Sequence, residues 1–284
     1  MSISRRQAVK TAAAFGILSG ATKIGLQAEA AMSKGRLHQS ACKWCYRDWS
    51  VEEMAQHAVK VGLVAVDLLT VDEWPIVEKH GLKCSMGSGV NPIPDGPNVK
   101  ENHKWIEANF RKLLPAAKKH SVPNLICFSG NRRDISDEEG WDNCAELLKK
   151  VMPQAEDLGI NVQMELLNSK VNHPDYQCDK TAWGVELCKR VDSPRFKLLY
   201  DIYHMQIMEG DVIRVIRDNA KYLGHFHTGG NPGRNEIDQS QELNYGAISK
   251  AIADLGYEGY FAHEFIPTRD PLKSLQEAVR ICQV

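Results

Sequence analysis

The sequence carries no excess of charge of either sign. Its 284 residues include 35 Lys and Arg residues against 36 Asp and Glu residues. Nucleic-acid-binding proteins usually show a basic excess or a basic stripe, so this balance argues against nucleic acid as a partner. Low-complexity segments are also absent. With 43% hydrophobic and 25% charged residues, the composition is that of an ordinary globular protein that needs no disulfide framework to fold.

Paired cysteine motifs are nearly absent as well. Cys42 and Cys45 form one C-x-x-C motif, and a zinc ribbon would need a second. We interpret both residues as packed thiols just after the first predicted strand. A disulfide between them, which an oxidising compartment permits, stays open. The remaining cysteines are interpreted as small buried hydrophobic residues.

The N-terminal part of the chain has no apolar run long enough to span a membrane. The apolar stretch at residues 11–26 is short and contains Lys23. It follows the pair Arg5-Arg6 and precedes residues 28–30, which fit an A-x-A cleavage site. This order is typical of a bacterial twin-arginine (Tat) export signal. The alternative is an ordinary amphipathic helix.

The Tat interpretation predicts two segments. Residues 1–30 form the signal peptide, and residues 31–284 form the mature domain. We therefore expect export by the Tat pathway to the periplasm or the cell exterior, with no membrane association once the signal is removed.

After the signal, short apolar runs alternate with amphipathic stretches. Ser50 and Glu53 form a capping-box pattern that starts one helix, and Gly62 stops it. Strands are predicted at residues 37–42, 64–68, 82–86, 124–128, 161–165, 196–201, 222–227 and 260–264, each followed by a helical stretch. Strands that alternate with helices indicate a parallel sheet, and eight such units in about 250 residues predict a single-domain α/β fold, the (β/α)8 TIM barrel.

A doubly wound sheet is the main competing fold. It would carry a Gly-rich phosphate loop after its first strand. Residues 42–46 occupy that place and contain no G-x-G-x-x-G pattern, which favours the barrel.

Four metal-capable side chains lie at the ends of consecutive predicted strands: Glu165, Asp201, His227 and Glu264. Barrel enzymes carry their functional groups at the C-terminal ends of strands. Adjacent strands are about 4.8 Å apart, so these groups can converge on one ion. Any one carboxylate alone is more often a helix cap or an ion-pair partner. Together, the oxygen-rich set suits Mn²⁺ or Mg²⁺, with Co²⁺ as a further candidate.

Three motifs resemble those of hydroxypyruvate isomerases. The stretch YDIYHMQIMEGD at 200–211 is the longest, and it is followed by NPGRNE at 231–236 and GYFAHEFIP at 259–267. The resemblance covers most of the chain after the signal. It implies a xylose isomerase-like barrel that acts on a small sugar or hydroxy-keto acid, and it implies a homo-oligomer.

The resemblance also implies residue roles. Glu165, Asp201 and Glu264 would be metal ligands, with the two glutamates as the acid/base pair, and His204 and Arg234 would contact substrate oxygens.

One position departs from the isomerase pattern. Hydroxypyruvate isomerases usually carry Gln at the position that matches His227. The tagatose and psicose 3-epimerase relatives carry His there, within an H-x-H run like residues 225–227.

Other residues near the predicted strand ends were assigned supporting roles. Lys43 and Trp44 follow the first strand and are predicted to line the substrate pocket. Asp67 ends the second strand and is predicted to support the site from behind the ligands. His225 is interpreted as a packed histidine, and His204 is placed in a loop after the sixth strand.

The predicted residues point to proton transfer next to a carbonyl. A bound metal would polarise the substrate as a Lewis acid, and one glutamate would remove the proton to form an enediolate. Return of the proton to the neighbouring carbon gives isomerisation, and return to the other face of the same carbon gives epimerisation. Both outcomes stay open.

Three other functions also stay open. The first is dehydratase or lyase chemistry on a keto-sugar or inosose. The second is an apurinic-endonuclease-type phosphodiesterase, which needs about three metals. The third is a sugar-binding protein with a decayed site.

Overall fold

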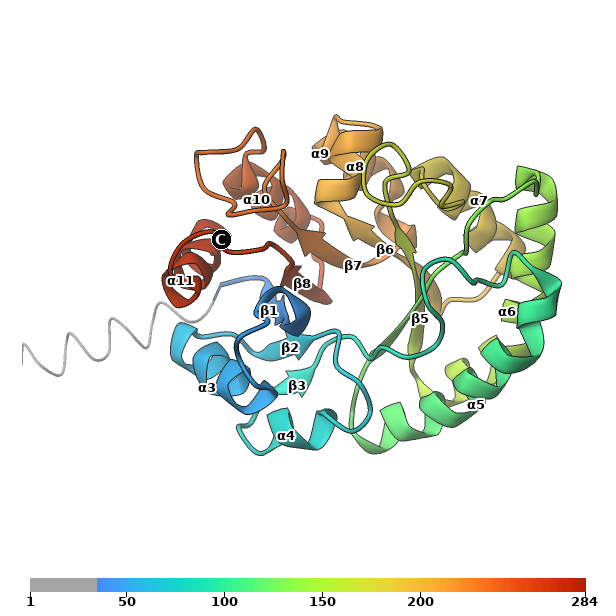
Figure 1. Ribbon diagram of the computed structural model, residues 1–284, viewed down its shortest axis with the longest axis horizontal. Helices are drawn as coiled ribbons and strands as arrows, with labels where there is room; N and C mark the ends of the chain where they lie inside the picture. Colours follow the sequence, from blue (N-terminus) through green and yellow to red (C-terminus); the bar gives the residue numbers. More distant parts are fainter. Residues whose placement is uncertain (1–34) are drawn as a thin grey trace, which may run out of the picture. The chain divides into compact units, whose positions relative to one another are not determined.

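Parallel strands form the centre of the structure, a computed structural model that describes residues 35–284 (Figure 1). The predicted signal at 1–30 lies outside the described residues. The sheet has the order β3-β2-β1-β8-β7-β6-β5-β4, and its paired strands are parallel. The strands are β1 His38–Cys42, β2 Ala65–Asp67, β3 Lys83–Cys84, β4 Asn124–Cys127, β5 Asn161–Leu166, β6 Phe196–Asp201, β7 Leu223–Thr228 and β8 Tyr260–His263.

The two end strands of this order are joined through Gly87, which closes the barrel. Its N–H donates to the carbonyl of Asn124 at 2.8 Å, and its own carbonyl accepts from the N–H of Ile126 at 3.0 Å. The approach is close because a Cβ at this position would lie 2.7 Å from the Trp74 ring. A glycine is therefore required where β3 meets β4.

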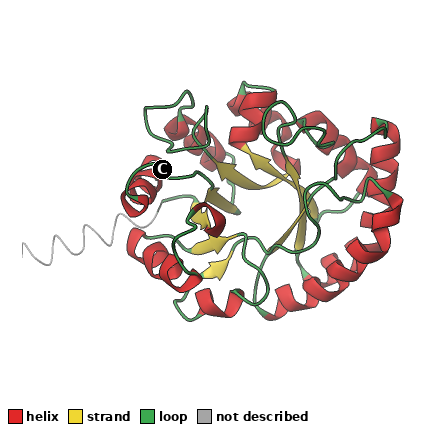
Figure 2. Cartoon of the chain, in the orientation of Figure 1, coloured by secondary structure: helices red, strands yellow, loops and turns green. Residues whose placement is uncertain are grey.

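Helices surround the strands, as Figure 2 shows. They are α3 Val51–Val61, α4 Trp74–Glu78, α5 His103–Lys119, α6 Asp137–Leu158, α7 Thr181–Val191, α8 Ile202–Met208, α9 Val212–Asn219, α10 Tyr245–Asp254 and α11 Pro271–Ile281, with short 3-10 turns η1 Lys43–Cys45, η2 Lys100–Asn102 and η3 Ala220–Tyr222. The arrangement confirms the predicted (β/α)8 barrel. Within residues 35–284, no helix has the length and apolarity needed to cross a membrane.

Local signals placed α3 correctly. The Ser50 hydroxyl accepts from the N–H of Glu53 at 3.1 Å, and the Glu53 carboxylate accepts from the N–H of Ser50 at 2.7 Å. Gly62 ends the helix in the left-handed region, at φ 84°. Reciprocal capping of this kind stabilises a helix start by about 1 kcal/mol.

The prediction was wrong at α8. His204 was placed in a loop, but residues 202–208 form a helix whose N-cap is Asp201. The Asp201 side chain accepts from the N–H of His204 at 3.0 Å. His204 therefore lies in the first turn of a helix, where its position relative to Asp201 is held by the backbone.

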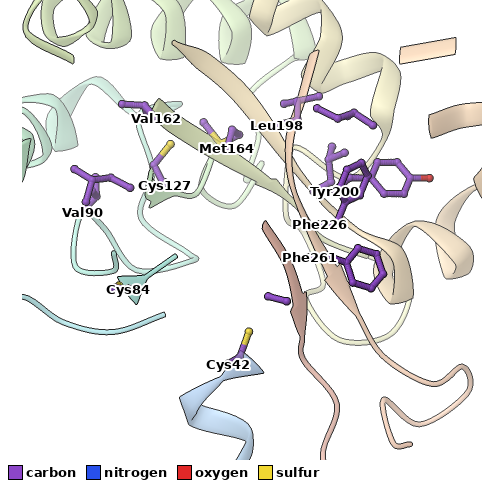
Figure 3. Close-up of a cluster of buried hydrophobic side chains, with 14 of the residues drawn as sticks. Cys42, Cys84, Val90, Cys127, Val162, Met164, Leu198, Tyr200, Phe226 and Phe261 are labelled. Atoms are coloured by element: carbon purple, nitrogen blue, oxygen red, sulfur yellow. The ribbon is translucent and has the colours of Figure 1, made fainter. Parts of the chain in front are cut away.

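Alternation along the strands separates two layers. In β7, His225 and His227 point one way and Phe226 the other, because side chains alternate along a strand. Phe226 packs outward with Tyr200 and Phe261, at ring-centroid distances of 6.2 and 6.4 Å. Figure 3 shows part of this buried layer between strands and helices. The polar side chains at the alternate positions, such as His225 and His227, point into the barrel interior.

The cysteines within residues 35–284 are free and buried. For Cys42 and Cys45 this favours the packed-thiol interpretation over a disulfide.

Candidate active site

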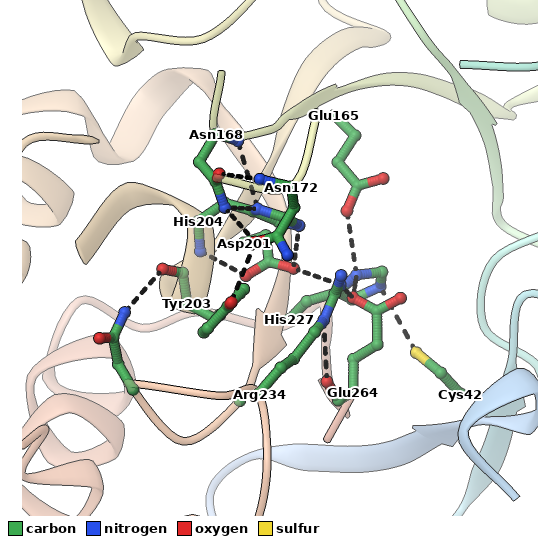
Figure 4. A network of polar contacts seen from close by, with 12 residues as sticks. Cys42, Glu165, Asn168, Asn172, Asp201, Tyr203, His204, His227, Arg234 and Glu264 are labelled. Atoms are coloured by element: carbon green, nitrogen blue, oxygen red, sulfur yellow. Dashed lines mark hydrogen bonds and ion pairs between the residues drawn. The ribbon is translucent and has the colours of Figure 1, made fainter. Parts of the chain in front are cut away.

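Four buried donors converge at the C-terminal end of the barrel, as Figure 4 shows. Glu165 is the penultimate residue of β5, Asp201 ends β6, and His227 lies one residue before the end of β7. Glu264 directly follows β8, which ends at His263, one residue before the predicted strand end. One ligand atom from each lies within 4.8 Å of the others, so the set can hold one metal ion.

Two atoms of this cluster are buried without a hydrogen-bond partner. They are Glu165 Oε1 and His227 Nδ1. His227 Nδ1 lies 2.8 Å from Glu264 Oε2 and 3.4 Å from Glu165 Oε1; these are ion-pair distances, but neither contact has hydrogen-bond geometry. Buried polar atoms normally have hydrogen-bond partners. An oxygen and a nitrogen that both lack one and face each other therefore indicate a place for a ligand.

Arg234 supplies positive charge between two of the carboxylates. Its Nη2 donates to Asp201 Oδ2 at 3.0 Å and also to Glu264 Oε2. The guanidinium lies over the rings of Trp44 and Tyr203, at 5.2 and 5.4 Å from the centroids. These aromatic faces hold it by cation–π attraction. Arg234 itself has φ 59°, a left-handed conformation that is uncommon for a residue with a side chain.

Burial and crowding shift the acidities of the cluster. Burial raises the pKa of Glu165 and of Asp201 above their usual values. Burial also opposes ionisation of Glu264, but the charges of Arg234 and His227 outweigh it and lower the pKa of Glu264 well below its usual range. Three carboxylates thus share one guanidinium and one imidazole. An added divalent cation would relieve their mutual repulsion.

His204 lies beside the cluster in its neutral form. Burial lowers the pKa of His204 well below its usual value, and the nearby charge of Arg234 lowers it further. Its Nδ1 accepts from the N–H of Asn168 at 3.2 Å, so the ring proton belongs on Nε2. Nε2 is 3.6 Å from Asp201 Oδ2 and has no hydrogen-bond partner. This N–H is free to donate to an oxygen of a bound molecule.

The two pocket residues predicted after β1 differ in their contacts. The Trp44 indole N–H donates to Glu264 Oε1 at 2.6 Å and therefore reaches the cluster. The Lys43 ammonium donates to the carbonyl of Tyr46 at 3.2 Å, within its own turn. A substrate contact by Lys43 stays a prediction.

Two neighbours of the site were missed or underestimated from the sequence. Tyr203 stacks near Arg234, and its hydroxyl donates to Asn172 at 2.9 Å. Cys42 Sγ lies 3.8 Å from His227 Nε2. Cys42 ends β1 just as Asp201 ends β6, and that shared strand-end position was the available signal.

The predicted supporting residue Asp67 lies behind His227. Its Oδ1 is 3.1 Å from His227 Nε2, and its Oδ2 is 3.0 Å from His225 Nε2. Burial opposes ionisation of Asp67, but the two histidines outweigh it and lower its pKa below the usual range. His225 also packs against Asp67, behind the four metal-capable residues, as expected.

Together the fold and the site define a (β/α)8 barrel with a metal-capable acidic centre at its catalytic end. The chain belongs to the xylose isomerase-like TIM barrel family, whose model matches residues 75–283.

Curated relatives of this chain are named as isomerases and epimerases. A 2-oxo-tetronate isomerase from Pectobacterium atrosepticum is 30% identical over 74% of this chain and 84% of its own. A D-psicose 3-epimerase from Ruminiclostridium cellulolyticum is 26% identical over 75% of this chain and 80% of its own. A protein named as a hydroxypyruvate isomerase from Xenopus laevis is 33% identical over 49% of each chain. The match therefore spans about half the length of that last relative. The chain is an enzyme of the isomerase class.

Solved structures share the fold. A family 2 AP endonuclease from Brucella melitensis superimposes with a TM-score of 0.76 at 22% identity, over 85% of this chain and 97% of that one. At this identity the likeness shows the barrel alone.

Proposed function

We propose that this chain is a divalent-metal-dependent isomerase of the hydroxypyruvate isomerase type. It moves a proton next to the carbonyl of a small hydroxy-aldehyde, hydroxy-ketone or sugar. The observation that carries the proposal is the pair of buried glutamates, Glu165 and Glu264, that face one metal-capable centre from strands separated by β6 and β7.

The donor set fits a divalent cation. Glu165, Asp201, His227 and Glu264 would hold Mn²⁺ or Mg²⁺, and Co²⁺ suits the same mixture of carboxylates and imidazole. The unpartnered Glu165 Oε1 and His227 Nδ1 support this assignment. When bound, the ion acts as a Lewis acid that eases removal of the C–H proton beside the substrate carbonyl.

The two glutamates, Glu165 and Glu264, transfer the proton that leaves the substrate carbon. One glutamate accepts it from carbon, and an enediolate results. The same glutamate returns it to the neighbouring carbon, or the opposite glutamate donates a proton of its own there; the substrate hydroxyl loses its proton and the former carbonyl oxygen gains one, which completes isomerisation. General acid–base groups of this kind contribute roughly 10²–10⁴-fold to the rate.

Two further groups stabilise and orient the substrate. The Arg234 guanidinium lies beside Glu264 and faces the negative charge that develops on the enediolate oxygens. The free Nε2–H of His204 donates to a substrate oxygen. The Trp44 indole fixes the orientation of the Glu264 carboxylate through its 2.6 Å hydrogen bond.

Ketose 3-epimerisation is the second candidate. One observation and one resemblance favour it: a D-psicose 3-epimerase matches three quarters of the chain, and residues 225–227 resemble the H-x-H run of the 3-epimerases. In this reaction the first glutamate keeps the proton that it removes, and the second glutamate, which starts protonated, donates its own proton to the other face of the same carbon.

Deuterium exchange observed by NMR tests both candidates. The protein is incubated in D₂O with Mn²⁺ or Mg²⁺ and hydroxypyruvate, tartronate semialdehyde, fructose, tagatose or 3-keto-sugars. We expect metal-dependent deuterium incorporation beside a carbonyl, and the product distinguishes isomerisation from epimerisation. Glu165→Gln and Glu264→Gln should each lower exchange about 10²–10⁴-fold, whereas Glu101→Gln, at an exposed carboxylate, should not.

The opposite result is equally informative. Exchange that persists in either glutamine variant would remove that glutamate from the acid/base pair. No exchange with any compound, despite bound metal, would exclude the isomerase and epimerase proposals for this panel and favour elimination from a larger keto-glycoside or inosose.

We also propose that the protein is exported through the Tat pathway, on the basis of the twin arginines Arg5 and Arg6. Cell fractionation tests this. Replacement of both by lysine should keep the protein in the cytoplasm, and unchanged export would contradict the proposal.

A further inference from the structure

The two ring nitrogens of His227 lie in different surroundings. Nδ1 faces the acidic centre and lies 2.8 Å from Glu264 Oε2, an ion-pair contact without hydrogen-bond geometry. Nε2 faces away from the centre and lies 3.1 Å from Asp67 Oδ1. The ring is fully buried, so its protonation pattern is set by these protein neighbours rather than by solvent.

Asp67 reaches His227 across the barrel interior. It ends β2, which is three strands away from β7 in the sheet order. Its Oδ2 accepts from the Ser85 hydroxyl at 2.5 Å and lies 3.0 Å from His225 Nε2, and its Oδ1 accepts from the Cys42 thiol at 3.6 Å. The carboxylate is fully buried and is held from several sides at one orientation.

We propose that Asp67 is a positioning residue that fixes the tautomer of His227 for metal binding. An ionised carboxylate only accepts hydrogen bonds, so Asp67 keeps the proton of His227 on Nε2. The proton that a bound cation displaces is then the one on Nδ1, and the lone pair freed there is directed into the cluster of Glu165, Asp201 and Glu264. This inference rests on the proposed function in one respect, because it takes His227 as a metal ligand.

The arrangement also shows what a histidine ligand requires that a glutamine ligand would not. A Gln side chain offers a carbonyl oxygen whichever neighbours lie behind it. Imidazole offers a lone pair at Nδ1 only when the proton lies on Nε2, so the histidine ligand needs an acceptor at that nitrogen. Asp67 is that acceptor.

A competing arrangement uses some of the same atoms. Cys42, Asp67 and His227 also lie close enough to hold one ion. An ion there would displace the proton that links Nε2 to Asp67, so the two arrangements exclude each other. The proposal therefore predicts one bound ion per chain, and the alternative predicts two ions that share His227.

Metal binding without substrate tests the proposal. Mn²⁺ affinity is measured by calorimetry for the full chain, for Asp67→Asn, for His227→Gln and for the double variant. We expect Asp67→Asn to weaken Mn²⁺ binding about 10–100-fold, as is typical for loss of a group that orients a ligand. The amide can donate to Nε2 and move the ring proton to Nδ1. In the His227→Gln background, the same change should have little further effect.

Two controls keep the result specific. Cys42→Ser alters a neighbour of Asp67 but leaves the carboxylate in place, and it should retain Mn²⁺ affinity within a few-fold. Histidine ¹⁵N NMR of the unmodified protein loaded with Mg²⁺, which is diamagnetic, reports the tautomer directly and needs no variant that must fold. We expect His227 to carry its proton on Nε2.

Each other outcome overturns the proposal. A proton on Nδ1 of the Mg²⁺-loaded protein, equal losses in both backgrounds, or unchanged affinity in Asp67→Asn would remove Asp67 from this role. Two ions per chain, one of them lost in Cys42→Ser, would establish the shared-histidine site. If the unmodified protein binds Mn²⁺ and only the Asp67 prediction fails, the proposed function is unaffected. If it binds no divalent metal, both fail.

Discussion

Arg234 joins the acidic and aromatic parts of the site through a single side chain. Its guanidinium contacts Asp201 and Glu264 together while it lies over Trp44 and Tyr203. A planar guanidinium can make these contacts at the same time because its donors point in fixed directions. A lysine ammonium has neither the fork geometry nor the flat face.

We therefore expect Arg234→Lys to lower kcat/KM for proton exchange by roughly 10–100-fold, the equivalent of one charged hydrogen-bonded pair. Steady-state kinetics on the substrate found by NMR give the value. Arg269→Lys is the matched control, since Arg269 is half exposed and pairs with Asp238 away from the centre. Equal losses in the two variants would point to a general effect of charge or stability.

At the scale of elements, turns and strand ends place the site. Asp201 ends β6 and caps α8 in one step, which is why His204 stands beside it. Gly87 closes the barrel between β3 and β4, where its backbone forms hydrogen bonds with residues of β4. A side chain there would meet Trp74 and Leu125, both fully buried.

Gly87→Ala should therefore destabilise the fold by about 1–3 kcal/mol, the usual cost of overpacking a dense core. Urea unfolding followed by circular dichroism measures it. Gly246→Ala is the control, because a Cβ there meets only ordinary contacts of 3.6 Å or more and the residue lies in α10. That change should be neutral or stabilising by up to about 1 kcal/mol.

Glu236 ties the loop after β7 to the start of α11. Its carboxylate accepts from the N–H and the hydroxyl of Thr268 and from the hydroxyl of Ser274. Burial alone would raise the pKa of Glu236, but these hydrogen bonds outweigh it and lower the pKa to about 2.

Because the folded-state pKa lies below the unfolded value of about 4.3, Glu236 stabilises the fold above that pH and loses its contribution as the pH falls toward 2. The free energy of unfolding should thus differ most between the unmodified protein and Glu236→Gln at pH 5–7, and the difference should shrink steadily below about pH 4. Urea titrations at several pH values test this. A difference that is constant with pH would mean that the carboxylate charge is not involved.

At the scale of the whole barrel, the centre depends on strands from both halves of the chain. Asp67 comes from β2, and the four donors come from β5 to β8. A cation bound to these donors binds the folded chain only, so it should stabilise the whole unit.

Mn²⁺ at about 100 times its dissociation constant contributes about 2.7 kcal/mol, which corresponds to roughly 5–10 °C in Tm for a domain of this size. Differential scanning calorimetry with and without a chelator measures the shift. The Glu165→Gln, Asp201→Asn double variant should show little of it. A shift of the same size in that variant would place the ion elsewhere.

Local signals were sufficient for the order of elements and for most ligand positions. The Ser50 and Glu53 cap lies within four residues of chain, and strand periodicity put Asp201 and His227 at strand ends. Helix α8 was missed because seven residues are too few to show a clear period and because its cap is the site aspartate itself.

Long-range contacts were beyond such signals. Asp67 and His227 are 160 residues apart in sequence and meet because the barrel curls β2 toward β7. No local sequence pattern therefore indicates their hydrogen bond. The same curvature brings Trp44 to Glu264, across 220 residues. Residue types and strand ends therefore specify which donors can bind a metal. Barrel closure specifies which groups orient them, since it alone sets the distance between strands that are far apart in the chain.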